Sequence, residues 1–76
     1  MRITDLEAGE AYVVRTSFRD DDGVLVLPGD VLTYERHRAV PVTGAFEVTF
    51  REETLTLHED RQRDVCEHVE RFLDPA

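Results

Sequence analysis

The feature that most constrains this chain is a change in the spacing of its apolar residues near His58. Between Glu10 and His58, apolar and β-branched residues alternate with polar ones, which is the pattern of strands that bury one face. Beyond His58 the apolar residues recur at helical spacing. The sequence therefore predicts a mainly β (β-rich α+β) domain in which short strands are followed by one amphipathic helix.

Turn signals divide the alternating region into five strands. Aspartate, proline and glycine are selected by tight turns, and they occur together in Asp20-Asp21-Asp22-Gly23 and in Pro28-Gly29-Asp30. The strands are expected over residues 11–18, 24–27, 31–40, 45–51 and 54–58. Short antiparallel strands of this kind predict a strongly bent sheet or a small barrel of about five strands.

The helix is expected over about residues 60–73. Its buried face consists of residues at i, i+4, i+7 and i+8, namely Val65, Val69, Phe72 and Leu73. Asp60 is the expected N-cap, and Asp74-Pro75 is the expected stop signal. We expect the buried face to pack on the strand face that carries Phe46, Val48 and Phe50.

Length and charge limit the class of protein. A chain of 76 residues has room for one domain, which we place over residues 1–76. The N-terminus carries acidic residues where a signal peptide needs an apolar stretch, and no apolar run reaches the length of a membrane span. We therefore expect a cytoplasmic protein that does not bind membranes. The net charge of -8 opposes direct binding to nucleic acid, and no signal sets an oligomeric state.

The turn and core residues resemble those of a known family. Most of the resemblance is carried by Leu6-x-x-Gly9-x-x-Tyr12-x-Val14 and Phe18-x-Asp20-x-Asp22-Gly23. It continues through Gly29-Asp30 ahead of Tyr34, Val40-Pro41-x-x-Gly44 and Glu59-x-x-Gln62-x-x-Val65. These motifs are similar to those of domain of unknown function 3601, a group of small, mainly bacterial domains. The resemblance implies an SH3-like fold with a small bent sheet, and it names no catalytic residue.

Three features suggest reactive or metal-binding chemistry, but for each of them we expect a purely structural role. The acidic run at residues 20–23 begins like a calcium loop, but apolar residues follow at once, so we expect a solvated hairpin turn. Cys66 lies on the apolar helical stripe, where a thiol is buried and unreactive. A metal set would need the convergence of His58, Asp60, Asp64 and His68, which we do not expect. We expect no catalytic residue, no metal and no cofactor, and hence no enzyme.

The strand over residues 31–40 carries the one locally basic stretch, Arg36-His37-Arg38. A period of two places Tyr34, Arg36 and Arg38 on one side. Arginines rarely stay unpaired in a core, so either a bulge reverses the alternation or the strand runs past the sheet and presents this side to solvent. The second option predicts that Tyr34, Arg36 and Arg38 bind an acidic or aromatic peptide segment. In the simpler alternative, the arginines pair with neighbouring carboxylates such as Glu47.

The predicted function is therefore a non-catalytic binding module for a protein or peptide partner. Two alternatives remain at this stage. One is a nucleic-acid-associated domain that uses the strand with Arg36 and Arg38. The other is an acidic protein that occupies the basic nucleic-acid-binding groove of a partner.

Overall fold

The protein has a mainly β fold, as the alternating sequence predicts, and the computed structural model describes residues 1–41 and 43–76. The strands are β1 (Ala11–Val14), β2 (Phe18–Arg19), β3 (Leu25–Val26), β4 (Val31–Val40), β5 (Ala45–Phe50), β6 (Thr54–His58) and β7 (Leu73–Pro75). The helical segments are the 3-10 turn η1 (Ile3–Asp5), the helix α1 (Arg63–Glu67) and the 3-10 turn η2 (Val69–Arg71). The predicted bounds of β4 and β6 are confirmed.

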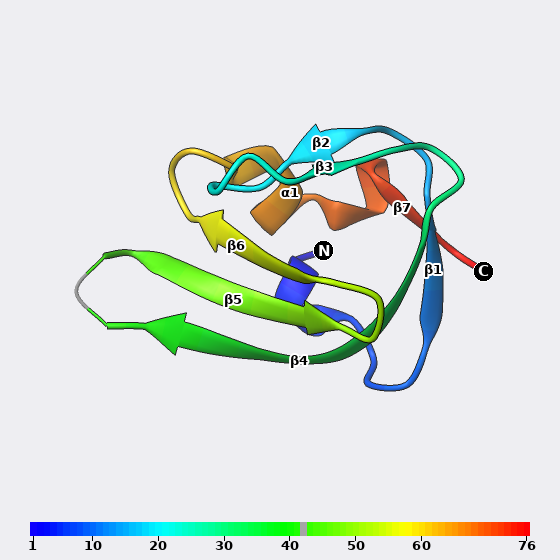
Figure 1. Ribbon diagram of the computed structural model, residues 1–76, viewed down its shortest axis with the longest axis horizontal. Coiled ribbons are helices and arrows are strands. Elements are labelled where there is room, and N and C mark those ends of the chain that lie inside the picture. Colours follow the sequence, from blue (N-terminus) through cyan, green and yellow to red (C-terminus); the bar gives the residue numbers. More distant parts are fainter. Residues whose placement is uncertain (42) are drawn as a thin grey trace.

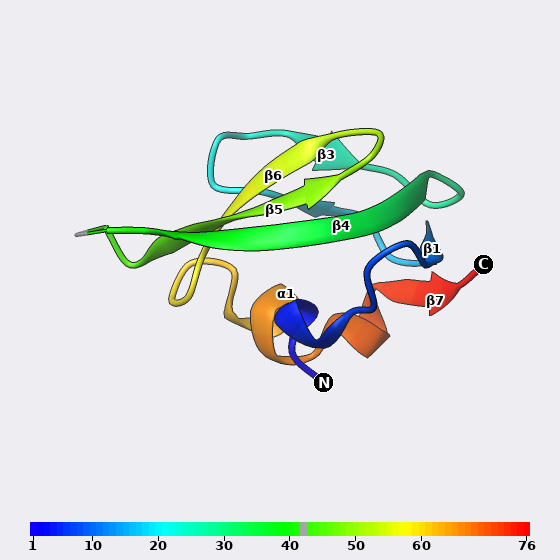
Figure 2. The same cartoon turned by 90° about the horizontal axis from the view of Figure 1, so that it is seen from below.

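Five strands form one antiparallel sheet in the order β6-β5-β4-β1-β7, and β2 pairs with β3 in a separate hairpin. β6 and β7 are the outer strands and do not pair with each other, so the sheet is bent but does not close into a barrel (Figure 1). Of the two predicted forms, the bent sheet is the one present. The helical segments form a second layer under the sheet, and the β4–β5 hairpin extends beyond that layer (Figure 2).

The strand predicted over residues 11–18 is in fact two strands, β1 and β2. The chain leaves the larger sheet after Val14, where one carbonyl oxygen, that of Phe72, accepts hydrogen bonds from two successive N–H groups. The donors are Arg15 at 2.7 Å and Thr16 at 3.3 Å. This corner directs β2 into its own hairpin with β3. The acidic residues 20–23 form the turn of that hairpin, as predicted.

The prediction of a helix over residues 60–73 is wrong about its length. Only Arg63–Glu67 is α-helical, and Gln62 rather than Asp60 stands at its N-cap. The side-chain oxygen of Gln62 accepts a hydrogen bond from the N–H of His58 at 2.7 Å, which joins the start of the helix to the end of β6. Asp60 instead forms an exposed ion pair with Arg63 at 3.3 Å.

The rest of the predicted helix is η2 and the strand β7. Leu73 of β7 pairs with Val14 of β1, so β7 supplies backbone partners along an edge of β1 that would otherwise be unpaired. The helical spacing is misleading because Val65, Val69 and Leu73 are buried by three different elements, a short helix, a 3-10 turn and a strand. Edge pairing of β1 depends on residues distant in sequence, which a local pattern does not report.

The core is one cluster that joins the sheet to the layer beneath it. Phe46, Val48 and Phe50 of β5 belong to the same buried cluster as Val65, Val69 and Leu73, as predicted. Phe72 differs from this prediction because it is only partly buried. Its ring meets that of Phe18 edge-on, with the ring centroids 5.6 Å apart. Phe72 therefore seals the margin of the core instead of filling its centre.

A buried carboxylate joins the β2–β3 hairpin to the larger sheet. Asp20 is 4% exposed, and its side chain accepts hydrogen bonds from the N–H groups of Asp22 (2.9 Å), Val24 (2.7 Å) and Thr56 (2.9 Å). The N–H of Asp21 donates to the carbonyl oxygen of Thr56 at 2.7 Å. Because Thr56 lies on β6, these bonds cover the outer edge of that strand.

Replacing Asp20 with alanine should destabilise the protein by about 3 kcal/mol or more, because three backbone N–H groups lose an acceptor and hydrogen bonds to charged groups contribute about 1.5–3 kcal/mol each. The Tm should fall by more than about 10 °C for a domain of this size. Asp22→Ala is the matched control, since Asp22 is exposed in the same turn, and should change stability by less than about 0.5 kcal/mol. Equal melting temperatures of the two variants in calorimetry would contradict this role of Asp20.

Candidate functional site

The centre of β4 contains a β-bulge. Tyr34 pairs with Phe50, and the next residue of β5, Thr49, pairs with Arg36, so Glu35 is the extra residue. A bulge of this kind shifts the strand by one residue, and each later side chain therefore points to the opposite face from the one that a regular strand would give it.

Beyond the bulge, His37 and Ala39 lie on the core side of the sheet, because their partners on β5 are buried residues. Arg36 and Arg38 lie on the outer face. Of the two options that the sequence left open for β4, the bulge is the one present. The prediction that Tyr34 shares one side of the strand with Arg36 and Arg38 is therefore wrong.

A carboxylate fixes the strand just before the bulge. The N–H and the hydroxyl of Thr33 both donate to the carboxylate of Glu52, at 2.6 and 2.8 Å. The N–H of Arg51 donates to the carbonyl oxygen of Thr33 at 2.8 Å. These hydrogen bonds, led by the one from the Thr33 N–H, hold the pKa of Glu52 below its ordinary value. The turn after β5 thus satisfies the backbone of β4 at the point where the regular ladder stops.

Tyr34 is part of the core and not of an exposed strip. It is 3% exposed, its ring meets that of Phe50 edge-on, and burial raises its pKa. The Tyr34 hydroxyl lies 2.7 Å from Nδ1 of His37, which holds the His37 ring against the underside of β4. Tyr34 therefore positions His37 and is not itself available to a ligand.

The two arginines are accessible on the outer face. Nε of Arg38 donates to Oε1 of Glu47 at 3.1 Å, which confirms the predicted pairing with that carboxylate. The side chain of Arg36 is 72% exposed, and the carboxylate nearest to it, that of Glu35, lies 3.7 Å away. Arg36 thus retains most of its hydrogen-bonding capacity for another molecule.

The edges of the larger sheet are protected except along half of β4. The Asp20 and Asp21 contacts cover β6, and β7 is a three-residue strand that contains Pro75. β1 pairs with β4 only up to Thr33, after which Tyr34 exchanges hydrogen bonds with Gly9 and Glu10. Among the described residues, no strand pairs with the other side of β4 beyond that point.

We call residues 35–39 of β4 the free edge. All five are exposed (Figure 1 shows this half of β4 along the lower margin of the sheet). Alternate residues of an antiparallel strand direct their N–H and C=O groups to opposite sides. Since Tyr34 directs these groups away from β5, and His37 and Ala39 share its face, the backbone groups of His37 and Ala39 also point away from β5.

A mainly apolar groove of about 340 Å³ lies under the hairpin, on the face to which His37 and Ala39 point. Ala39 and Phe46 form its roof together with Val40, Ala45 and other hairpin residues. Thr4 of η1 and Glu59 form the opposite wall. The groove exists because the β4–β5 hairpin extends beyond the helical layer, so its underside is not covered there (Figure 2).

Cys66 is buried in α1, as the helical stripe predicts. Burial raises the pKa of its thiol to about 11, from an ordinary value of 9.0. Because the folded state disfavours the thiolate, the stabilising contribution of this thiol is complete below about pH 9 and is lost as the pH rises towards about 11. A thiol of this kind is a poor nucleophile near neutral pH.

Cys66 should therefore react slowly with an alkylating reagent at pH 7.5 in the folded protein and rapidly in denaturant. The reason is that the thiol is both inaccessible and protonated in the folded state. Mass spectrometry over time gives the two rates. Equal rates before and after unfolding would show that the thiol is accessible.

The residues considered as a metal set make local contacts instead of converging. Nδ1 of His58 accepts a hydrogen bond from the N–H of Asp60 at 3.1 Å, and its Nε2 lies 3.0 Å from the carbonyl oxygen of Thr43. His68 ends α1, where its N–H donates to the carbonyl oxygen of Asp64 at 2.8 Å. Within residues 1–41 and 43–76, no three His, Cys, Asp or Glu side chains are grouped so as to hold a metal ion.

The fold is shared with a solved structure. An integron cassette protein from the mobile metagenome of Vibrio cholerae superimposes with a TM-score of 0.87 and 23% sequence identity, over 93% of this chain and 88% of that one. The sequence matches no protein-family model and no curated protein, so membership of domain of unknown function 3601 stays a prediction. In the part of the chain that the structure describes, no helix is long and apolar enough to cross a membrane.

Proposed function

We propose that this protein is a non-catalytic peptide-binding module that adds an extended segment of a partner protein to the free edge of β4. One observation carries the proposal. The free edge is the only long stretch of strand in the described sheet that is exposed and lacks a neighbour on one side. Unpaired edge groups are a template for strand addition, in which backbone hydrogen bonds supply affinity.

Charge on the outer face favours an acidic segment. A strand added beside β4 places alternate side chains on the outer face, next to Arg36 and Arg38. In the described part of the chain, the only carboxylate within ion-pair distance of Arg36 is that of Glu35, at 3.7 Å. Arg38 has further N–H groups that do not contact Glu47. Acidic side chains at those positions of the partner gain charge-assisted hydrogen bonds. Arg36 and Arg38 thus keep the binding role proposed from the sequence, while Tyr34 does not.

A second copy of this chain is a poor occupant of the free edge. Two copies of β4 can pair antiparallel in a register centred on His37, which matches residues 35–39 with each other, or in one centred on Arg38, which matches residues 36–40 with each other. In the first register Arg36 lies opposite Arg38 of the other copy, and in the second Arg38 lies opposite itself. Like charges directly opposite one another are destabilising in a sheet. The arginines therefore favour a different, acidic strand.

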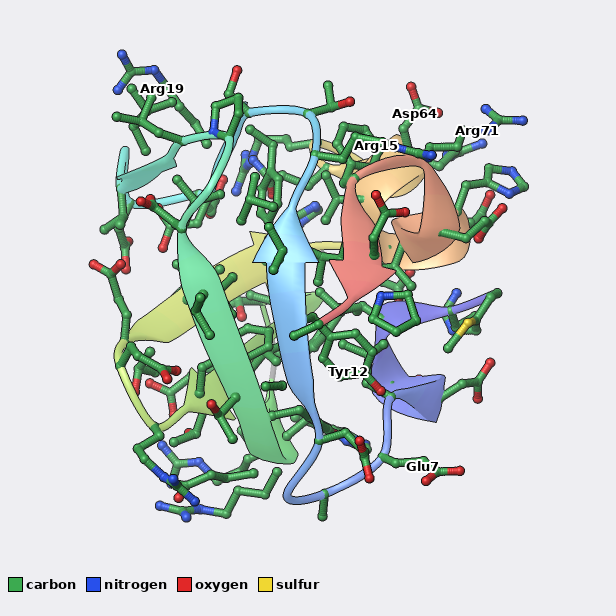
Figure 3. The ribbon with its side chains drawn as sticks, turned by 90° about the vertical axis from the view of Figure 1, so that its right-hand side faces the viewer. Glu7, Tyr12, Arg15, Arg19, Asp64 and Arg71 are labelled. Carbon is green, nitrogen blue, oxygen red and sulfur yellow. The ribbon has the colours of Figure 1, made fainter. Side chains whose placement is uncertain are left out.

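Nucleic acid has less support as the ligand. Six of the nine arginines lie within ion-pair distance of a carboxylate. Figure 3 shows Arg19 well apart from Arg15 and Arg71, and the acidic side chain of Asp64 lies beside these last two. The net charge of -8 opposes the counterion release on which phosphate binding depends.

Two synthetic ten-residue peptides test the proposal, one that alternates valine with glutamate and one that alternates valine with lysine. The glutamate peptide should bind about tenfold more tightly, because two exposed ion pairs replace two like-charge contacts. Amide resonances of His37 and Ala39 should shift and become protected from exchange. Nuclear magnetic resonance titration measures both the affinity and the site.

The double variant Arg36→Gln, Arg38→Gln should remove the preference for glutamate. The variant Arg63→Gln, Arg71→Gln changes the net charge equally at exposed positions away from β4 and should retain it. If neither peptide perturbs the amides of the free edge, strand addition is ruled out. If both peptides bind equally well there, strand addition stands and the acidic preference is overturned.

A further inference from the structure

We propose that the groove under the hairpin binds one apolar side chain of the added segment, and that Ala39 and Phe46 determine which side chain fits. This inference rests on the proposed strand addition at the free edge. It adds a specificity element that backbone pairing lacks, since backbone groups are the same in every peptide. Binding at a sheet edge commonly combines backbone pairing with pockets for alternate side chains.

The geometry of the edge directs one side chain towards the groove. Side chains of an added strand alternate between the outer face and the inner face. Each inner side chain lies beside an inner side chain of β4, with Cβ atoms about 5 Å apart. The two inner residues of the free edge are His37 and Ala39. The added segment therefore presents its inner residues next to these two positions.

The two inner positions differ in the space that they leave. The His37 ring is held by the Tyr34 hydroxyl at 2.7 Å, and it is itself part of the lining of the groove. Ala39 carries only a methyl group, and the groove beneath it is roofed by Ala39 itself and by Phe46. The partner residue beside Ala39 is therefore the one whose side chain enters the groove.

The size and chemistry of the groove fit an aliphatic side chain. Its volume of about 340 Å³ is near the lower end of the range of about 300–1,000 Å³ for small-molecule sites. Most of its lining is apolar, and the carboxylate on its far wall, that of Glu59, is already paired with Arg2. Burial of a leucine side chain there removes apolar surface from water without leaving a buried charge unpaired.

A peptide series and a groove-filling variant test the inference. The glutamate-alternating peptide carries alanine, valine or leucine at its central inner position. The wild-type protein should bind the leucine peptide about tenfold more tightly than the alanine peptide, because the groove buries part of the added side chain. Ala39→Leu fills the groove from above, so it should remove the preference for the leucine peptide over the alanine peptide.

Ala76→Leu is the control, since it makes the same substitution at an exposed residue at the opposite end of the molecule (Figure 1). It should retain the leucine preference. Ala39 is exposed, so Ala39→Leu should keep the wild-type Tm, which separates a filled groove from unfolding. If the wild type binds the alanine and leucine peptides with equal affinity, the role of the groove is overturned, while the proposed strand addition stands. If no peptide of the series binds, the proposed strand addition fails with it.

Discussion

The bulge at Glu35 lets a single ten-residue strand serve both the core and the surface. Without it, the alternation that buries Tyr34 would also turn Arg36 and Arg38 towards the apolar side of the sheet. Burial of two arginines would cost far more than one interrupted ladder bond. Next to the interrupted ladder, the N–H and the hydroxyl of Thr33 donate hydrogen bonds to the carboxylate of Glu52 and so do not lack a partner. The rest of the candidate site follows from this reversal.

The same reversal separates the functional groups of β4 onto two faces and one edge. The arginines face outward, His37 and Ala39 face the groove, and the backbone groups of those two residues point to the free edge. At the N-terminal side, the backbone N–H of Glu7 donates to the hydroxyl of Tyr12 at 3.2 Å, and both residues lie near η1 (Figure 3). The chain around β1 is thus fixed where the free edge begins, and it does not extend to cover it.

The sequence predicts the β class and most strands because alternation and turn residues are local signals. β4 and β6 were placed at their observed bounds, and the burial of Cys66 followed from its place on the apolar stripe. The long helix was wrong because Leu73 serves as a strand residue, and that depends on the distant β1. The bulge was foreseen only as an option. The contact between Glu52 and Thr33, which satisfies the strand just before the bulge, spans nineteen positions, and no periodicity reports it.

Hydrogen exchange of individual amides in the free protein tests the central claim, that β4 carries an unpaired edge, without any ligand. The amides of Arg36 and Arg38 face β5 in the ladder and should be protected. The amides of His37 and Ala39 should exchange nearly as fast as those of an unstructured chain. This alternation along consecutive residues is expected only if one side of the strand is open. Equal protection at all four positions would show that the edge is covered and would contradict the account.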